Sequence, residues 1–365
     1  MRYSIPAAIG LALSALFTTP ASAASILDWM QEHRPATSGK PQDQPADSAT
    51  LLTLEPDETE MYPHPSADGR FLLTLTGNHH RGGPWISRRY SENGDPANVV
   101  SDDPGAIDST TWMDPHTVCF LSEKTGELGL WEKSADGEGM QRRIQALTGL
   151  ISQPLLLKDG RTIIAVRLKP ADKKNSHRQT RERDYFNNWS FDDASSEIVR
   201  FNSDGSEQVL SQGMNPSLSP DGNWIAFAMP VGRSMHLFRV HPDGTELIQL
   251  TDSRSSDVQP SWSPDGQWLL FTSDRTAPDL RHADKGAWDI WSIDINGRNL
   301  AQVTRDPARD GGAWMGSDGR IYFHSDRKID KATLAQHQLK SASAGFHIWS
   351  INWQQPDTTG TSSDK

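Results

Sequence analysis

Short apolar runs alternate with Asp-Gly or Asn-Gly turns along most of the chain. Runs such as "TVCFLS", "WIAFAM" and "WLLFTS" are rich in β-branched and aromatic residues, which is typical of strands. The turns match, because Asp-Gly and Asn-Gly supply the positive φ that tight hairpins require. The pattern predicts an all-β protein.

The turns recur at a nearly regular spacing. They lie at Asp68-Gly69, at Asp114 in "MDPHTV", and at Asp159-Gly160, Asp221-Gly222, Asp265-Gly266 and Asp318-Gly319. Successive turns are therefore 46, 45, 62, 44 and 53 residues apart. A repeat of about 40 to 50 residues with four strands per unit is typical of β-propellers. The sequence predicts six four-stranded blades.

The sixth unit lacks a fourth strand. After "HIWSINW" the chain continues as the polar tail "QQPDTTGTSSDK", whereas the apolar run Leu51–Leu54 stands unassigned before the first unit. We therefore expect this N-terminal run to close the last blade, which leaves fewer sheet edges exposed. The expected organisation is a signal peptide (1–23), a flexible leader (24–48), a six-bladed β-propeller (49–354) and a disordered tail (355–365).

The repeat resembles that of TolB-type β-propellers. The phrases "PSWSPDGQWLLFTSDR…WDIWSIDINGRNLAQVT" and "PSLSPDGNWIAFAM…HLFRVHPDGTELIQLT" carry the resemblance, which covers roughly residues 49 to 354. It implies a propeller fold and suggests a periplasmic protein of the cell envelope, since TolB links the Tol-Pal system. TolB has an α/β domain before its propeller, and residues 24–48 are too few to form one.

The N-terminus is typical of an export signal. Arg2 precedes an apolar run from Ala7 to Phe17, and Ala21-Ser22-Ala23 forms a small-residue cleavage site. No apolar stretch is long enough to span a membrane. We expect a periplasmic protein, secreted through a cleaved signal peptide.

Composition excludes some functions. The net charge is −11, which argues against general nucleic-acid binding because phosphate contacts need a basic face. The single cysteine, Cys119, has no disulfide partner in the chain and lies in an apolar run, as a small buried hydrophobe does.

Extra residues fall between the second and third strands of three units, at Lys169–Ser195, Arg275–Ala287 and Arg327–Gly345. These links emerge on one side of a propeller, so we expect one elaborated face, and loops on a rigid scaffold are where binding usually resides. We call this side the insertion face. Its first insertion is basic and then aromatic, and supplies most of the candidate partner-binding residues: Lys173, Lys174, Arg178, Arg181, Tyr185 and Trp189, with Trp288 beside a second insertion. A solvated loop is the competing interpretation of the charges.

Catalytic signatures are absent from the sequence, which has no G-x-S-x-G, H-E-x-x-H or phosphate-binding glycine loop. No cofactor is predicted. A divalent metal at the channel mouth is an alternative, with candidate ligands His79, His282, His324, His337 and His347. The repeated Ser-Asp-Arg at 273–275 and 325–327 is interpreted as a structural ion pair or turn cap.

The sequence thus favours an exported, non-enzymatic binding platform that engages an envelope or periplasmic protein through the insertion face. The alternative is a glycan-active enzyme of the lyase kind, or a sugar-binding protein, that uses the channel mouth. No nucleic acid and no membrane span are expected.

Overall fold

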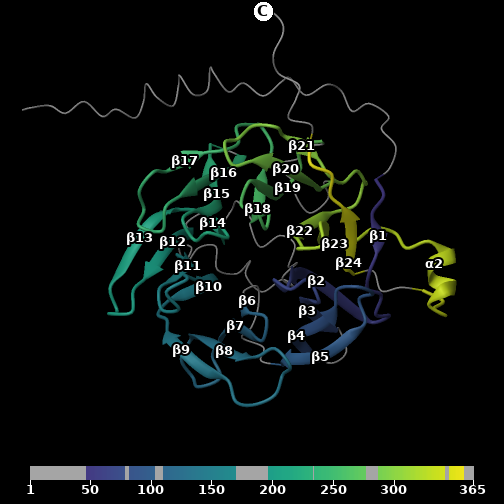
Figure 1. Ribbon diagram of the computed structural model, residues 1–365, viewed down its shortest axis with the longest axis horizontal. Helices are drawn as coiled ribbons and strands as arrows, with labels where there is room; N and C mark the ends of the chain where they lie inside the picture. Colours follow the sequence, from purple (N-terminus) through teal and green to yellow (C-terminus); the bar gives the residue numbers. More distant parts are fainter. Residues whose placement is uncertain are drawn as a thin grey trace, which may run out of the picture. The chain divides into compact units, whose positions relative to one another are not determined.

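The computed structural model describes residues 47–78, 82–102, 110–169, 196–232, 234–276, 287–341 and 345–356. These residues form six four-stranded antiparallel sheets arranged as blades around a central axis (Figure 1). The all-β prediction and the prediction of a six-bladed propeller are confirmed.

Each of the first three blades is a meander of consecutive strands. Blade 1 comprises β2 (Glu58–Pro65), β3 (Phe71–Asn78), β4 (Gly82–Tyr90) and β5 (Pro96–Ser101). Blade 2 comprises β6 (Thr111–Asp114), β7 (Thr117–Ser122), β8 (Gly129–Ser134) and β9 (Arg142–Ala146). Blade 3 comprises β10 (Leu150–Leu156), β11 (Ile163–Leu168), β12 (Ser196–Phe201) and β13 (Glu207–Gln212).

The next two blades repeat this order, and the sixth departs from it. Blade 4 comprises β14 (Met214–Leu218), β15 (Ile225–Val231), β16 (Ser234–Val240) and β17 (Ile248–Gln249). Blade 5 comprises β18 (Asp257–Trp262), β19 (Trp268–Ser273), β20 (Asp289–Asp294) and β21 (Ala301–Gln302). Blade 6 comprises β22 (Asp310–Met315), β23 (Arg320–Ser325), β24 (His347–Asn352) and, as its outer strand, β1 (Thr50–Leu51).

The Asp-Gly turns form the hairpins between the first and second strands of five blades. The glycine of each turn has a φ between 67° and 81°, a region that costs a side chain energy because Cβ crowds the backbone. In three of these turns the Asp also accepts a hydrogen bond from a preceding serine, as Asp265 does from Ser263. The turn chemistry visible in the sequence therefore sets the hairpins.

The apolar core lies between neighbouring blades. One cluster joins Leu73 and Ile86 of blade 1 to Val118 and Phe120 of blade 2, and a second joins blade 2 to blade 3. Every residue of β19 is buried, because this strand packs against other elements on both faces. This is why the second strand of each unit appears in the sequence as an apolar run.

The N-terminal strand closes the ring, as the sequence predicts. In β1, Thr50 is paired with Ser350 and Leu51 with Trp349 of β24. The N–H groups of Leu52 and Thr53 donate to the carbonyl of Ile348, and the hydroxyl of Thr53 accepts from the Ile348 N–H at 3.1 Å. Figure 1 shows β1 beside β24 at the outer edge of blade 6.

An ion pair reinforces this closure. Arg327 donates from Nη1 and Nη2 to the two carboxylate oxygens of Asp47, at 2.7 and 2.9 Å, and also binds the buried Asp310. Asp47 additionally accepts from the backbone N–H of Arg305 and of Ala49. The sequence places Asp47 in the leader, yet it is fixed to blade 6.

One short helix was not predicted. α2 (Lys331–Gln336) lies in the insertion between β23 and β24, begins at its N-cap Asp330, and buries none of its residues. No helix of the described residues is long and apolar enough to cross a membrane.

We expect closure to depend on residues 47–55. A chain that begins at Pro56 should lose at least about 3 kcal/mol of unfolding free energy, because it leaves Arg327 without one buried carboxylate and exposes the edge of β24. The measurement is chemical denaturation, with a chain that begins at Asp47 as the control. Equal stability of the two chains would contradict the closure.

Candidate functional site

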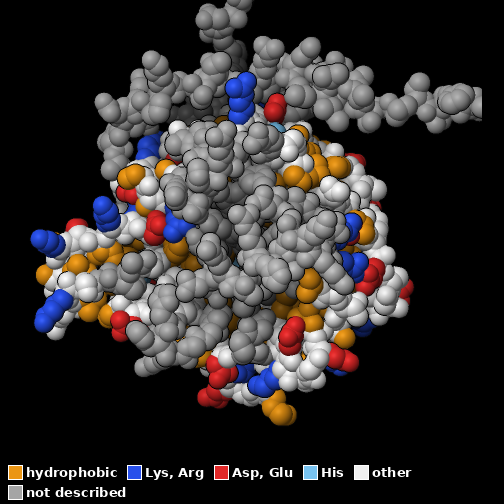
Figure 2. Space-filling model, turned by 180° about the vertical axis from the view of Figure 1, so that it is seen from behind, with side chains coloured by type: hydrophobic (Ala, Val, Ile, Leu, Met, Phe, Trp, Pro, Cys, Tyr) orange, Lys and Arg blue, Asp and Glu red, His pale blue; other side chains and the backbone are white. Residues whose placement is uncertain are grey.

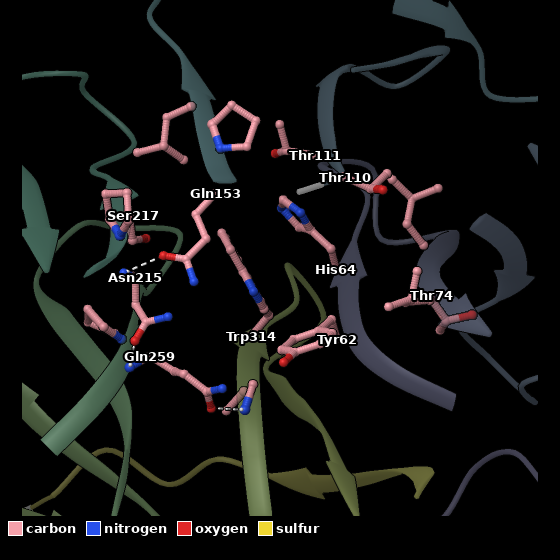
Figure 3. A pocket seen from close by; sticks show the side chains of 18 residues that line it. Tyr62, His64, Thr74, Thr110, Thr111, Gln153, Asn215, Ser217, Gln259 and Trp314 are labelled. Carbon is pink, nitrogen blue, oxygen red and sulfur yellow. Dashed lines mark hydrogen bonds between the residues drawn. The ribbon is translucent and has the colours of Figure 1, made fainter. Parts of the chain in front are cut away.

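A cavity of about 160 Å³ lies on the axis of the ring, among the innermost strands (Figure 3). Its wall comes from all six blades. The lining residues are Tyr62, His64, Leu73, Thr74, Leu75, Thr110, Thr111, Gln153, Pro154, Leu155, Asn215, Pro216, Ser217, Gln259, Pro260, Gly312, Ala313 and Trp314.

A repeated bulge in the innermost strands shapes the wall. The register shifts at the same point of β2, β10, β14, β18 and β22. The first residue inside each bulge has a positive φ: Tyr62 (53°), Gln153 (50°), Asn215 (54°), Gln259 (53°) and Gly312 (58°). Proline follows four of these residues and favours a bulge because it has no N–H for the ladder. The strain of a positive φ is thus repeated around the axis, and strain of this kind clusters at functional sites.

Hydrogen bonds link these bulges from blade to blade. The Asn215 N–H donates to Gln153 Oε1 at 2.7 Å, and the Gln259 N–H donates to Asn215 Oδ1 at 3.4 Å. The Gly312 N–H donates to Gln259 Oε1 at 2.9 Å. Each amide oxygen therefore satisfies a backbone donor of the next blade, and we call these three side chains the amide ring.

The described residues of the cavity wall carry no formal charge near neutral pH. None of its lining residues is Lys, Arg, Asp or Glu. Burial lowers the pKa of His64 to about 4, although a hydrogen bond with the Thr110 backbone opposes the shift. The neutral imidazole stacks on Trp314, with ring centroids 3.9 Å apart. The wall is therefore suited to hydrogen bonding and apolar contact rather than to proton transfer at neutral pH.

His324, a candidate metal ligand, is buried in the packing beside the cavity. Its Nδ1 accepts a hydrogen bond from the Tyr62 N–H at 3.2 Å, and burial lowers its pKa to about 3. Gly312 makes room for the ring, because a Cβ there would lie 2.6 Å from Cε1 of His324.

The two other metal candidates that the structure describes, His337 and His347, differ in burial. His347 is buried 3.5 Å from the carboxylate of Glu60, and His337 is the exposed C-cap of α2. Within the described ranges, no group of three or more His, Cys, Asp or Glu side chains has an arrangement that could hold a metal ion. His79 and His282 lie outside the described residues.

The partner-binding candidates divide in two. Six of them, Lys173, Lys174, Arg178, Arg181, Tyr185 and Trp189, lie outside the described residues. Trp288 is fully buried in a core cluster of blades 4 and 5. Its proposed role as a contact residue is therefore corrected to one of packing, since its side chain lies in the interior rather than in solvent.

The two Ser-Asp-Arg motifs, at 273–275 and 325–327, have structural roles, as the sequence indicated. Arg275 binds both carboxylate oxygens of the buried Asp257 at 2.7 Å, and Asp274 accepts from the Ser256 N–H. In blade 6, Asp326 accepts in the same way from the Arg309 N–H. In both motifs, the Asp connects the end of the second strand to the start of the innermost strand of the same blade.

The amide ring was not predicted from the sequence. Its signal was a polar residue before proline at the same place in successive units, as in Gln153-Pro154, Asn215-Pro216 and Gln259-Pro260. Proline indicated a bulge, but only the structure shows that the preceding side chains meet across blade boundaries.

Comparisons with known proteins agree on the fold. No protein-family model matches the chain, and no curated protein matches its sequence. Among solved structures, a chain described as "putative TolB from Agrobacterium tumefaciens" is 20% identical over 67% of this chain and 80% of its own, with a TM-score of 0.50. The calcium-binding protein regucalcin from the same organism is 11% identical over 84% of this chain and 93% of its own, with a TM-score of 0.52.

A third likeness is more distant. Oligogalacturonate lyase from Vibrio parahaemolyticus is 13% identical over 76% of this chain and 75% of its own, with a TM-score of 0.46. Identities this low show the fold alone. The chain is a six-bladed β-propeller, and its fold is similar to that of the chain described as a putative TolB.

Asp289 provides a test of the electrostatics of the insertion face. Its Oδ2 accepts from Thr276 and Gln302, while its buried Oδ1 has no hydrogen-bond partner among the described residues. Burial, with Asp310 nearby, raises its pKa to about 7. The native state therefore holds a proton that the unfolded state releases above about pH 4, and the native state loses stability as the pH rises toward 7.

We predict that Asp289→Asn removes this loss. Between pH 5 and pH 8 the unfolding free energy of the variant should fall less than that of the wild type, by about 1 to 4 kcal/mol. Urea denaturation at several pH values measures the difference, and Asp57→Asn on the surface serves as the control. Parallel pH profiles for wild type and Asp289→Asn would show that Asp289 is ionised in the native state.

Proposed function

We propose that the protein is a non-enzymatic binding platform that engages an envelope or periplasmic protein through the insertion face. One observation carries the proposal. The long insertions of blades 3, 5 and 6 all join the second strand to the third, at β11–β12, β19–β20 and β23–β24. Because every blade repeats the same strand order around the ring, these connections leave the scaffold on one side.

The described part of this face supports a charged contact. The insertion in blade 6 carries exposed Lys328, Lys331 and Lys340 and one exposed acid, Asp330, although the chain as a whole has a net charge of −11. Figure 2 shows Lys and Arg side chains at its left margin, where α2 lies in this view. Together with the basic first insertion, the segment favours an acidic partner surface, since complementary charge speeds association.

The neutral wall of the axial cavity also favours binding over catalysis. Amide and hydroxyl groups recognise a partner without changing protonation state, and His64 remains neutral at physiological pH. Nothing in the described ranges specifically favours the glycan-active alternative. Periplasmic localisation rests on the export signal in the sequence and is part of this proposal.

The basic first insertion provides the test. Replacing Lys173, Lys174, Arg178 and Arg181 by Ser should leave cooperative unfolding unchanged, because the segment is expected to be exposed. The same variant should weaken capture of the partner from envelope extracts by at least about tenfold, since each lost rim contact contributes up to about 1 kcal/mol.

A matched variant controls for net charge. Replacing Arg70, Lys158, Arg161 and Arg298 by Ser removes four exposed basic residues from the hairpins of the opposite side. This variant should capture the partner as the wild type does. Equal loss in both variants would indicate a general charge effect, and undiminished capture by the first would exclude the basic segment as the contact.

A further inference from the structure

The amide ring has a fixed polarity. A backbone N–H can only donate, so the side-chain atom that it meets must be the amide oxygen. The atoms that accept from the backbone nitrogens of the next blade are therefore Oε1 of Gln153, Oδ1 of Asn215 and Oε1 of Gln259. The N···O distances are 2.7, 3.4 and 2.9 Å, respectively. The NH2 group of each side chain must then point away from that neighbour.

The three NH2 groups point into the cavity. Figure 3 shows Gln153, Asn215 and Gln259 on one side of Trp314, with their amide nitrogens directed toward the interior. All three residues line the cavity, and their hydrogen bonds to the next blade use the amide oxygens and leave the NH2 groups unengaged by those bonds. Each NH2 group has two N–H donors, so the three side chains together have six N–H donors on the cavity side.

The remaining polar groups of the wall can also donate. Hydroxyls come from Thr74, Thr110, Thr111 and Ser217. None of the described lining residues is a carboxylate that would repel an anion, and the oxygens of the amide ring already accept from backbone. Among the described residues, the distinctive feature of the cavity is therefore three NH2 groups that can only donate, beside hydroxyls that can donate as well as accept.

We propose that the axial cavity binds an oxyanion, such as a carboxylate, through the NH2 groups of Gln153, Asn215 and Gln259. An oxyanion accepts at every oxygen and donates nothing, which matches the three NH2 groups that face the cavity. Hydrogen bonds to a charged acceptor are stronger than neutral ones and offset the desolvation of the ion. A cavity of about 160 Å³ has room for a small group such as a carboxylate.

The carboxylate can have two sources with the same chemistry. One is a free small molecule, and the other is the C-terminal carboxylate of a peptide chain that enters the channel. The site is independent of the proposed contact at the insertion face, because its residues come from the innermost strands.

Side-chain amide resonances of the full chain report on the site directly. In the 15N-labelled protein, titration with sodium acetate at fixed ionic strength should shift the NH2 signals of Gln153, Asn215 and Gln259 along one saturable curve. Acetamide has nearly the same shape but no charge, and should not saturate these shifts below a tenfold higher concentration. Equal responses to acetate and acetamide, or no response to acetate, would overturn the proposal.

Two variants test the role of the amides. Gln153→Glu and Gln259→Glu keep an oxygen for the next blade but replace the donor by an acceptor. Each should weaken acetate binding at least tenfold, whereas Gln212→Glu on the exposed outer strand β13 should not. If Gln153→Glu and Gln259→Glu both bind acetate as tightly as the wild type does, the proposal is also overturned. If neither variant folds, the comparison of acetate with acetamide on the wild type decides alone.

A second comparison separates the sources. Triglycine with a free C-terminus and triglycine amide differ only in the carboxylate. Binding of acetate together with free triglycine, but not of triglycine amide, supports a peptide terminus as ligand. Binding of acetate alone supports a free small molecule, and both outcomes retain the oxyanion site.

Discussion

The structure depends on the antiparallel pairing of β1 with β24. Without it, the last blade would have three strands and an exposed edge, and the two ends of the chain would lose the strand pairing that joins them. Thr53 shows that the N-terminal segment is a true fourth strand. Its hydroxyl accepts from the Ile348 N–H just as Thr251 accepts from Leu237 and Thr304 from Ile290 in blades 4 and 5.

Closure of the ring also positions the axial cavity. The amide ring spans from blade 3 to blade 6, and each of its hydrogen bonds requires a fixed distance between neighbouring innermost strands. Positive φ at non-glycine residues is unfavourable in itself, so the bonds offset a conformational cost of about 1 kcal/mol or more at each position. The same bonds set the polarity of the cavity by directing the NH2 groups inward. Stability and the proposed binding chemistry therefore share one set of side chains.

The sequence predicted the scaffold because its signals are local. Asp-Gly turns and apolar runs identified the blades, and the missing fourth strand of blade 6 identified the role of Leu51. The amide ring could not be predicted, since its partners are 62, 44 and 53 residues apart and meet only when blades pack side by side. Trp288 was misassigned because a position near a long loop suggested exposure, whereas the chain there pairs with Arg309 before β20 begins. The basic segment at 173–181 remains a prediction.

Hydrogen exchange of the amides of Leu52 and Thr53 tests the closure most directly. If both ends of the chain form one blade, these amides exchange only on global unfolding, with the same free energy as amides in the centre of β24. Exchange of Leu52 and Thr53 at the rate of an unstructured peptide, while β23 and β24 remain protected, would contradict the account.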